Sequence, residues 1–268
     1  MSGTGQLIGA ALARIRSSRP LVHQITNYVV MNDTANVTLQ VGALPVMAHA
    51  KEEVREMVAL AGALVLNPGT LEPSWVEAML IAGEEAKRRG IPVVLDPVGA
   101  GATSYRTESN LRILAEVRPD IVRGNAGEIG ALMGAGGQVR GVESVGEMAD
   151  APGVAKQAAA SWGAVVAMTG ARDLVTDGRR VLGVDNGDPW LTTMTGTGCS
   201  STALVAAFAA VESDYVMAAA GALACLGYAA ELAAPGAAGP GSFKVALHDA
   251  IYNMTAEKLS QGARVVEL

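Results

Sequence analysis

The sequence predicts an α/β fold in which a central, mostly parallel sheet carries helices on both faces. Short apolar runs without polar alternation occur at Ala63–Leu66, 91–95 and 164–168, and strands buried on both faces have this pattern. Segments of helix length separate these runs, as expected where a crossover helix follows each parallel strand. No charged linker or low-complexity run divides the 268 residues, so we expect a single domain over residues 1–268.

The first third of the chain is expected to contain a helix that ends before Pro20, followed by two short strands that flank a second helix. These three elements are expected at 21–25, 32–41 and 44–48, with Gly42 closing the helix. Thr26, Asn27 and Tyr28 are a polar interruption in apolar surroundings. They predict a loop that binds a small polar ligand or, alternatively, a local Asx turn.

Strands and helices are then expected to alternate up to about residue 170. Helices are predicted at 73–89, at 107–117 and from Asn125 onward, with a short strand at 120–122. Residues 173–184 are typical of a hairpin or of two edge strands. The last third is expected to be helical at about 199–212, 214–233 and 243–261.

Composition excludes several classes of partner. The chain has 20 basic and 26 acidic residues, a net charge of −6, and no basic stripe that would bind nucleic acid or an anionic membrane. Its two cysteines, Cys199 and Cys225, are too few for a disulfide framework or a cysteine-based metal site, which fits a reducing cytoplasm. The histidines lack metal-ligand spacing and are expected to be structural or exposed: His23, His49 and His248.

Two segments resemble membrane or targeting sequences. Residues 215–234 are long enough to span a bilayer, but they consist mainly of Ala and Gly and include Glu231, which favours a buried helix of a soluble protein. The N-terminal 20 residues contain three arginines and no acid, a pattern shared by transit peptides and by an ordinary first helix.

A threonine- and glycine-rich turn leads directly into an alanine-rich helix at residues 192–212. Gly196 and Gly198 permit backbone conformations that bring N–H groups close to a ligand. The helix, expected from about Ser200, adds free N–H donors and the positive end of its dipole, so the turn predicts a phosphate-binding cradle. The alternative is an ordinary helix start capped by Ser200 or Ser201.

Polar residues at the carboxyl ends of predicted parallel strands are the other candidates, because ligands bind at this edge of such sheets. The rule selects Asn67, Asp96, Arg123 and Thr169. Asp96 follows a wholly apolar strand and precedes Pro97, and a carboxylate placed there is costly unless it is paired or binds a metal. Arg123 is expected either to balance phosphate charge or to form a salt bridge.

Asn125 and Glu128 have the spacing of a capping box at a helix start. A second interpretation is that Glu128, with Asp96, holds the water shell of a magnesium ion, because hard divalent ions prefer oxygen ligands. Spacing alone favours the cap.

Five motifs in consistent order resemble the ribokinase-like superfamily and, within it, the hydroxyethylthiazole kinase family. They are HQITNYVVMNDTANVTL, NPGT, DPVGAGAT, RGNAGEI and TGTGC, and the similarity extends over residues 20–258. The resemblance implies a ribokinase-like three-layer fold. It also implies phosphorylation of the hydroxyl of 4-methyl-5-(2-hydroxyethyl)thiazole by ATP and Mg2+ in thiamine biosynthesis or salvage, by a homotrimer with active sites between subunits.

The resemblance also implies roles for individual residues. Met47 and Gly196 would contact the thiazole, with Asn27 approaching from a neighbouring subunit. The other roles concern ATP and the metal: Arg123 and Thr169 at the ATP phosphates, Gly198 and Cys199 in the anion hole, and Asp96 and Glu128 at magnesium.

Cys199 stands where most ribokinase-like enzymes have an aspartate base. A free thiol has a pKa of about 8.5, and a helix N-terminus is expected to lower it. Because phosphoryl transfer depends mainly on alignment and charge neutralisation, we expect Cys199 to position groups and to be at best a weak base.

Two other functions fit the same motifs. One is a kinase of another small alcohol such as hydroxymethylpyrimidine, which Cys199 in place of an aspartate disfavours. The other is a non-catalytic nucleotide-binding protein, which the presence of Asp96, Arg123 and Glu128 disfavours.

Overall fold

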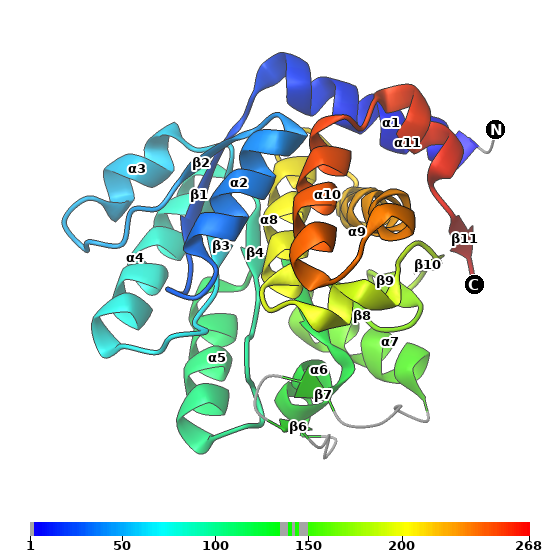
Figure 1. Ribbon diagram of the computed structural model, residues 1–268. Coiled ribbons are helices and arrows are strands. Elements are labelled where there is room, and N and C mark those ends of the chain that lie inside the picture. Colours follow the sequence, from blue (N-terminus) through cyan, green and yellow to red (C-terminus); the bar gives the residue numbers. More distant parts are fainter. Residues whose placement is uncertain (1–2, 135–138, 141–142, 145–149) are drawn as a thin grey trace.

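A nine-stranded sheet lies between two layers of helices in the computed structural model, which describes residues 3–134, 139–140, 143–144 and 150–268 (Figure 1). The strand order is β11-β10-β9-β8-β5-β4-β3-β1-β2. The strands are β1 Leu21–Ile25, β2 Leu44–Val46, β3 Ala63–Leu66, β4 Val93–Leu95, β5 Ile121–Asn125, β8 Val165–Thr169, β9 Asp173–Thr176, β10 Val181–Val184 and β11 Val265–Glu267.

Six neighbouring strands are parallel: β2, β1, β3, β4, β5 and β8. The strands β9, β10 and β11 add an antiparallel edge. A separate two-stranded sheet pairs β6, Val139–Arg140, with β7, Glu143–Ser144. The mostly parallel sheet confirms the predicted fold class.

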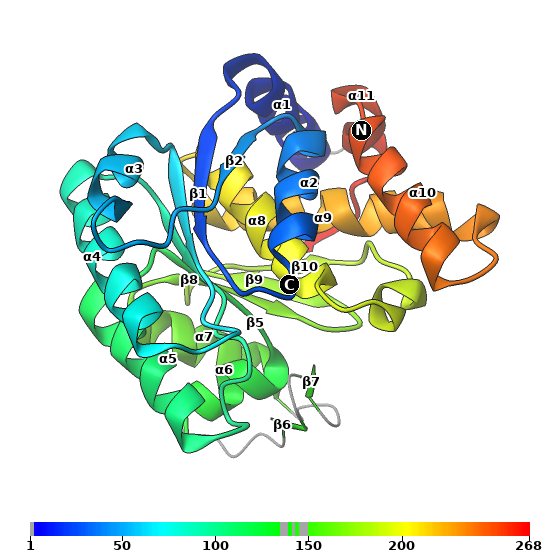
Figure 2. The same cartoon turned by 60° about the vertical axis from the view of Figure 1, so that its left-hand side comes forward.

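Helices cover both faces of the sheet (Figure 2), and the two helical layers build two hydrophobic cores, one on each face. Side chains alternate along each strand, so that Val65 faces one core while Leu64 and Leu66 face the other. The first layer consists of α1 Gly3–Ser18, α2 Met31–Val41, α8 Thr197–Ala209, α9 Tyr215–Ala233, α10 Pro240–Tyr252 and α11 Ala256–Gly262. The second consists of α3 Val54–Leu60, α4 Pro73–Arg89, α5 Ser104–Val117, α6 Ala126–Leu132 and α7 Ala151–Trp162.

One helix in the described part of the chain has the length and hydropathy to cross a membrane, Tyr215–Gly236, and 78% of its most apolar window is buried. It contains α9, which packs against α8 and α10. Small residues such as Gly221 allow this close approach, because a Cβ there would lie 3.3 Å from the Phe208 ring. The long apolar segment is therefore covered by protein, as the sequence predicted.

The structure corrects four predicted boundaries. The helix expected from about Ser200 begins at Thr197, because Gly196 adopts a φ of 89° and is itself the N-cap. The helix expected over 243–261 is two helices, since Thr255 caps a new start by accepting from the Lys258 N–H. The strand expected at 120–122 continues to Asn125, so Arg123 lies inside β5. The strand expected at 91–95 begins at Val93.

Candidate active site

Polar side chains meet where α8 begins against the carboxyl ends of the central strands. Asn67 follows β3, Asp96 follows β4, Arg123 lies in β5, and Thr169 ends β8. Helix α8 packs on β1, β3 and β4, which brings its first turn to the same edge of the sheet. The rule of strand ends thus identified a group of residues that the fold gathers in one place.

The first turn of α8 presents free backbone donors. The N-cap is Gly196, which has no side chain to accept from the amides that follow, and the first N–H groups of a helix have no partner within it. The alternative in which Ser200 or Ser201 caps the helix is wrong, because both lie inside α8 and the Ser201 hydroxyl donates to the Gly198 carbonyl at 2.6 Å. The geometry favours an anion at this turn.

Gly198 lies directly against the guanidinium of Arg123. A Cβ at position 198 would be 2.6 Å from Arg123 Nη1 and 3.1 Å from Nη2. Arg123 Nη2 donates to the Thr169 hydroxyl at 2.7 Å, while its buried Nε has no hydrogen-bond partner among the described residues. A cation with an unused donor therefore faces the N-terminus of α8, as phosphate binding requires.

Asp96 is fully buried beside this cation. Its Oδ1 lies 3.7 Å from Arg123 Nη1. The salt bridge that was one alternative for Arg123 is therefore present, and the same guanidinium also lies against the turn that starts α8. Burial raises the pKa of Asp96, and the charge of Arg123 and hydrogen bonds from neighbours oppose the shift. In the described part of the chain, Oδ1 accepts no hydrogen bond. A bound cation would give this buried oxygen a partner.

Glu128 forms the capping box that its spacing predicted. Its carboxylate accepts from the Asn125 N–H at 2.9 Å and from the Gly99 N–H at 2.9 Å, and it lies in the first turn of α6 rather than at a strand end. Burial, and then the charge of Asp96, raise its pKa to about 7. Two buried carboxyl groups that repel each other fit a divalent cation, although no cluster of three or more His, Cys, Asp or Glu side chains occurs within the described ranges.

Cys199 points into the same cluster but is not an activated thiol. Its Sγ accepts from Asn67 Nδ2 at 3.1 Å, and burial together with the charge of Asp96 raises its pKa. The prediction that the helix N-terminus would lower this pKa is wrong, because desolvation and the neighbouring acid outweigh the dipole. The raised pKa favours the neutral thiol at physiological pH.

Asn27 belongs to the site of its own chain. Its Nδ2 donates to Asn67 Oδ1 at 2.9 Å and lies 3.9 Å from Cys199 Sγ. Within this chain the paired strands β1 and β3 bring the amides of Asn27 and Asn67 together, and the approach of Asn27 to the site of a neighbouring subunit stays a prediction. The Asx turn is also present, since the Val29 N–H donates to Asn27 Oδ1 at 3.1 Å.

Met47 lies beyond the end of β2 and is half-buried. Its backbone is linked to the ring of His49. The ring of His49 bonds to the Met47 backbone and also lies 3.2 Å from the Thr26 nitrogen, so it connects the two segments that carry Met47 and Asn27. The His49 ring packs on Trp75, with centroids 4.3 Å apart, which confirms a structural role for this histidine.

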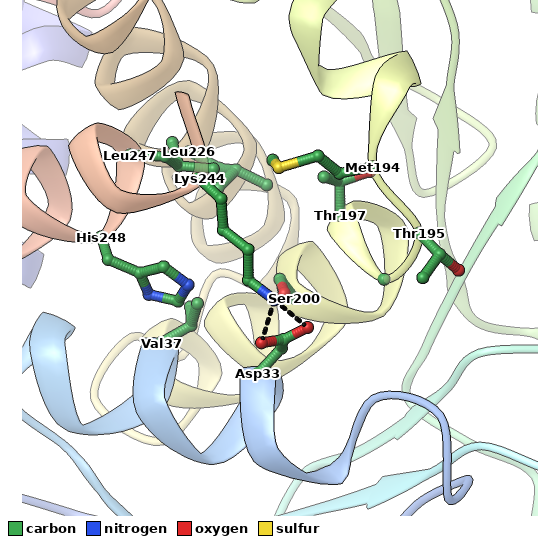
Figure 3. A pocket seen from close by; sticks show the side chains of 11 residues that line it. Asp33, Val37, Met194, Thr195, Thr197, Ser200, Leu226, Lys244, Leu247 and His248 are labelled. Atoms are coloured by element: carbon green, nitrogen blue, oxygen red, sulfur yellow. Dashed lines mark hydrogen bonds and ion pairs between the residues drawn. The ribbon is translucent and has the colours of Figure 1, made fainter. Parts of the chain in front are cut away.

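A small cavity lies where the turn before α8 faces α2 and α10 (Figure 3). Its volume of about 20 Å³ has room for about one water. Lys244 of α10 reaches across it to Asp33 of α2, at 2.7 Å (Figure 3). Gly196 is packed tightly here, because a Cβ would lie 3.0 Å from Val30 Cγ1. The cavity is therefore too small for a ligand much larger than water.

Two residues of this cluster received no role from sequence reasoning. Thr202 donates its hydroxyl to Asp96 Oδ2 at 3.0 Å, and it stands three residues after Cys199, a spacing that places both on one helix face. Asn67 was selected as a strand end but was given no chemistry, although its side chain bonds to both Asp96 and Cys199.

Comparison with known proteins places this geometry in a family. A model of the hydroxyethylthiazole kinase family matches residues 12–257. The chain belongs to this family. It is 64% identical to hydroxyethylthiazole kinase of Roseiflexus sp. (strain RS-1), covering 100% of the chain and 99% of that protein. It is 66% identical to the enzyme of the same name from Desulforudis audaxviator (strain MP104C), covering 96% and 94%.

Solved structures agree with the family and with the wider fold. A hydroxyethylthiazole kinase protein from Pyrococcus horikoshii OT3 superposes with a TM-score of 0.90 at 46% identity, covering 98% of this chain and 99% of that one. A ribokinase-like superfamily protein from Enterococcus faecalis V583 gives a TM-score of 0.66 at 12% identity, covering 92% and 95%. The second likeness shows the fold alone, and both confirm the predicted ribokinase-like architecture.

Proposed function

We propose that the protein transfers the γ-phosphoryl group of ATP to the hydroxyl of 4-methyl-5-(2-hydroxyethyl)thiazole, in thiamine biosynthesis or salvage in the cytoplasm, and that the 268 residues form one kinase domain. The observation that carries the proposal is the turn from Gly196 to Cys199, which starts α8 without a side-chain cap and lies against the Arg123 guanidinium at Gly198. Family membership identifies the acceptor alcohol, since the curated relatives are hydroxyethylthiazole kinases.

Each residue of the turn and its neighbours has a distinct role in this proposal. The amides of Gly198 and Cys199 and the guanidinium of Arg123 stabilise charge on the transferring phosphoryl group. Thr169 orients Arg123 through their hydrogen bond and contacts the ATP phosphates. The alcohol oxygen bonds to the γ-phosphorus as the bond to the ADP oxygen breaks, and the alcohol proton is released to solvent. Alignment rather than a strong base accelerates the step. The neutral Cys199 thiol is consistent with such a mechanism.

We propose that magnesium is the metal of this reaction and that Asp96 and Glu128 hold it, in part through water. The buried Oδ1 of Asp96, which accepts no hydrogen bond in the described ranges, supports this assignment. A bound Mg2+ would neutralise phosphate charge. The acceptor would lie on the other side of the turn, against Gly196, Asn27 and Met47.

We also propose that the active form is a homotrimer with sites near subunit boundaries. Tyr28 and Val29 support this, because they are 62% and 66% exposed immediately after the buried Asn27. Exposed apolar side chains beside a site indicate a surface that another chain covers. Light scattering after gel filtration tests this, and Val29→Asp is expected to shift the trimer mass toward that of the monomer. A parent protein that elutes as a monomer at all concentrations contradicts the assembly.

A coupled ADP-release assay tests the proposed activity. ADP release is expected only with the thiazole alcohol, ATP and Mg2+ together, and loss of signal in EDTA is expected to be reversed by added Mg2+. Turnover of hydroxymethylpyrimidine but not of the thiazole alcohol would assign the other acceptor. Nucleotide binding without turnover of either alcohol would instead identify a non-catalytic nucleotide-binding protein.

A further inference from the structure

The side-chain amide of Asn67 lies at the centre of the site with every hydrogen-bonding position used. Its Nδ2 donates to Asp96 Oδ2 at 2.8 Å and to Cys199 Sγ at 3.1 Å. Its Oδ1 accepts from Asn27 Nδ2 at 2.9 Å and from the Gly69 N–H at 3.0 Å. An asparagine offers two N–H donors and two acceptor lone pairs, so this side chain has a single orientation that satisfies all four partners.

The surroundings hold this orientation in place. Asn67 is 1% exposed, and the turn that follows it closes over Asn27, because a Cβ at Gly69 would lie 2.5 Å from Asn27 Nδ2. Rotating the amide by half a turn would set its oxygen against Asp96 and its nitrogen against the Asn27 and Gly69 donors. Such a flip would lose the bonds to Asp96, Asn27 and the Gly69 N–H in a buried site, where unpaired polar groups are costly.

The same amide determines which oxygen of Asp96 remains available. Asn67 and Thr202 both donate to Oδ2, at 2.8 and 3.0 Å. Oδ1 is left facing Arg123, with no hydrogen bond among the described residues. Two donors therefore fix the carboxylate plane and direct its free oxygen toward the phosphate side of the site.

We propose that Asn67 is a positioning residue that couples the acceptor side of the site to the phosphate side. Through Oδ1 it holds Asn27, which the proposed function places at the alcohol, and through Nδ2 it holds Cys199 and Asp96. The assignment rests on the proposed function for the identity of the two sides. Asn67 is placed as a positioning residue because protein groups occupy all four of its hydrogen-bonding positions.

Equilibrium binding separates this role from a general structural one. Isothermal titration calorimetry of Asn67→Ala is expected to show the thiazole alcohol binding at least about tenfold more weakly, since misplacement of contact groups is costly. A non-hydrolysable ATP analogue with Mg2+ is expected to bind within about threefold of the parent, because Thr202 still holds Asp96. Asn110→Ala is the matched control: Asn110 is also fully buried, but its amide donates only to the Arg106 carbonyl in α5.

A double variant tests the coupling at Asp96. Either Asn67 or Thr202 alone keeps a donor on Oδ2, so Asn67→Ala with Thr202→Val is expected to weaken nucleotide binding at least about fivefold beyond the product of the single effects. A loss of nucleotide binding in the double variant equal to the product of the two single effects would overturn the proposed coupling. So would alcohol binding by Asn67→Ala within about twofold of the parent, or a loss that Asn110→Ala reproduces.

The assays also distinguish this proposal from the proposed function. Turnover by the parent is measured first, and failure of turnover contradicts the kinase assignment while the binding comparisons still test Asn67. If Asn67→Ala does not fold, Asn67→Ser, which puts a small hydroxyl in place of the amide, is measured in the same way against Asn110→Ser. Equal effects of these two serine variants on alcohol binding would overturn the proposal.

Discussion

Replacing Gly198 by alanine is expected to damage catalysis without damaging the fold. The new Cβ would lie 2.6 Å from Arg123 Nη1, about 0.8 Å short of the 3.4 Å at which ordinary contact begins. Arg123 is the group that moves, because the contact is the flexible end of its side chain whereas the Cβ is fixed to α8. The bond from Arg123 to Thr169 would be strained or lost.

The size of the effect follows from this displacement. A misplacement of about 1 Å in a positioning group costs on the order of 10²-fold in rate, and loss of one preorganised donor costs a similar factor. Stability is expected to hold, since the preference for alanine over glycine in a helix, about 1 kcal/mol, offsets the loss of one hydrogen bond, about 1 kcal/mol.

Steady-state kinetics and thermal unfolding measured together test this expectation. Gly198→Ala is expected to lower kcat by about 100-fold with Tm unchanged. Gly241→Ala is the matched control, because Gly241 lies in α10 with open space where a Cβ would be placed, and its kcat is expected to match the parent. A kcat for Gly198→Ala within about threefold of the parent would refute the reasoning that Arg123 must stay against this turn.

Three further predictions follow from the charges of the site. Cys199→Ser is expected to lower kcat by less than about tenfold in the ADP-release assay, because the parent thiol is neutral, and complete loss would restore a base role to Cys199. Arg123→Ala is expected to lower kcat by about 10³-fold or more, and near-normal turnover would remove Arg123 from the phosphate. Burial and the charge of Asp96 raise the pKa of Glu128 from 4.5 to about 7. Between these pH values the folded state binds the proton more tightly than the unfolded state. The contribution of Glu128 to the free energy of unfolding is therefore complete below pH 4.5 and is lost as pH rises through about 7. Denaturant titrations in EDTA are therefore expected to show the parent losing stability relative to Glu128→Gln between these pH values, and a constant difference would contradict the shifted pKa.

The sequence predicted the strands and the edge at which the site forms because both follow from local pattern. The apolar run Ala63–Leu66 is buried on both faces, as its composition indicates. The polar residues that follow such runs converge because parallel strands share one carboxyl edge. Asp96 and Arg123 were identified in this way without any contact information.

Other features depend on packing that local pattern does not encode. The raised pKa of Cys199 comes from burial and from Asp96, which is 103 positions away in the chain, so the helix start alone predicted the wrong direction. Asn27 reaches Cys199 only because β1 pairs with β3 and α8 packs across both. The break before Thr255 was missed because apolar residues continue on both sides of the cap.

A crystal structure with Mg2+, a non-hydrolysable ATP analogue and the thiazole alcohol is the most direct test of the anion cradle. We expect the terminal phosphate within hydrogen-bond distance of the Gly198 and Cys199 amides and of the Arg123 guanidinium, with the alcohol beside Gly196. Phosphates bound elsewhere, with those amides directed to other partners, would contradict the account.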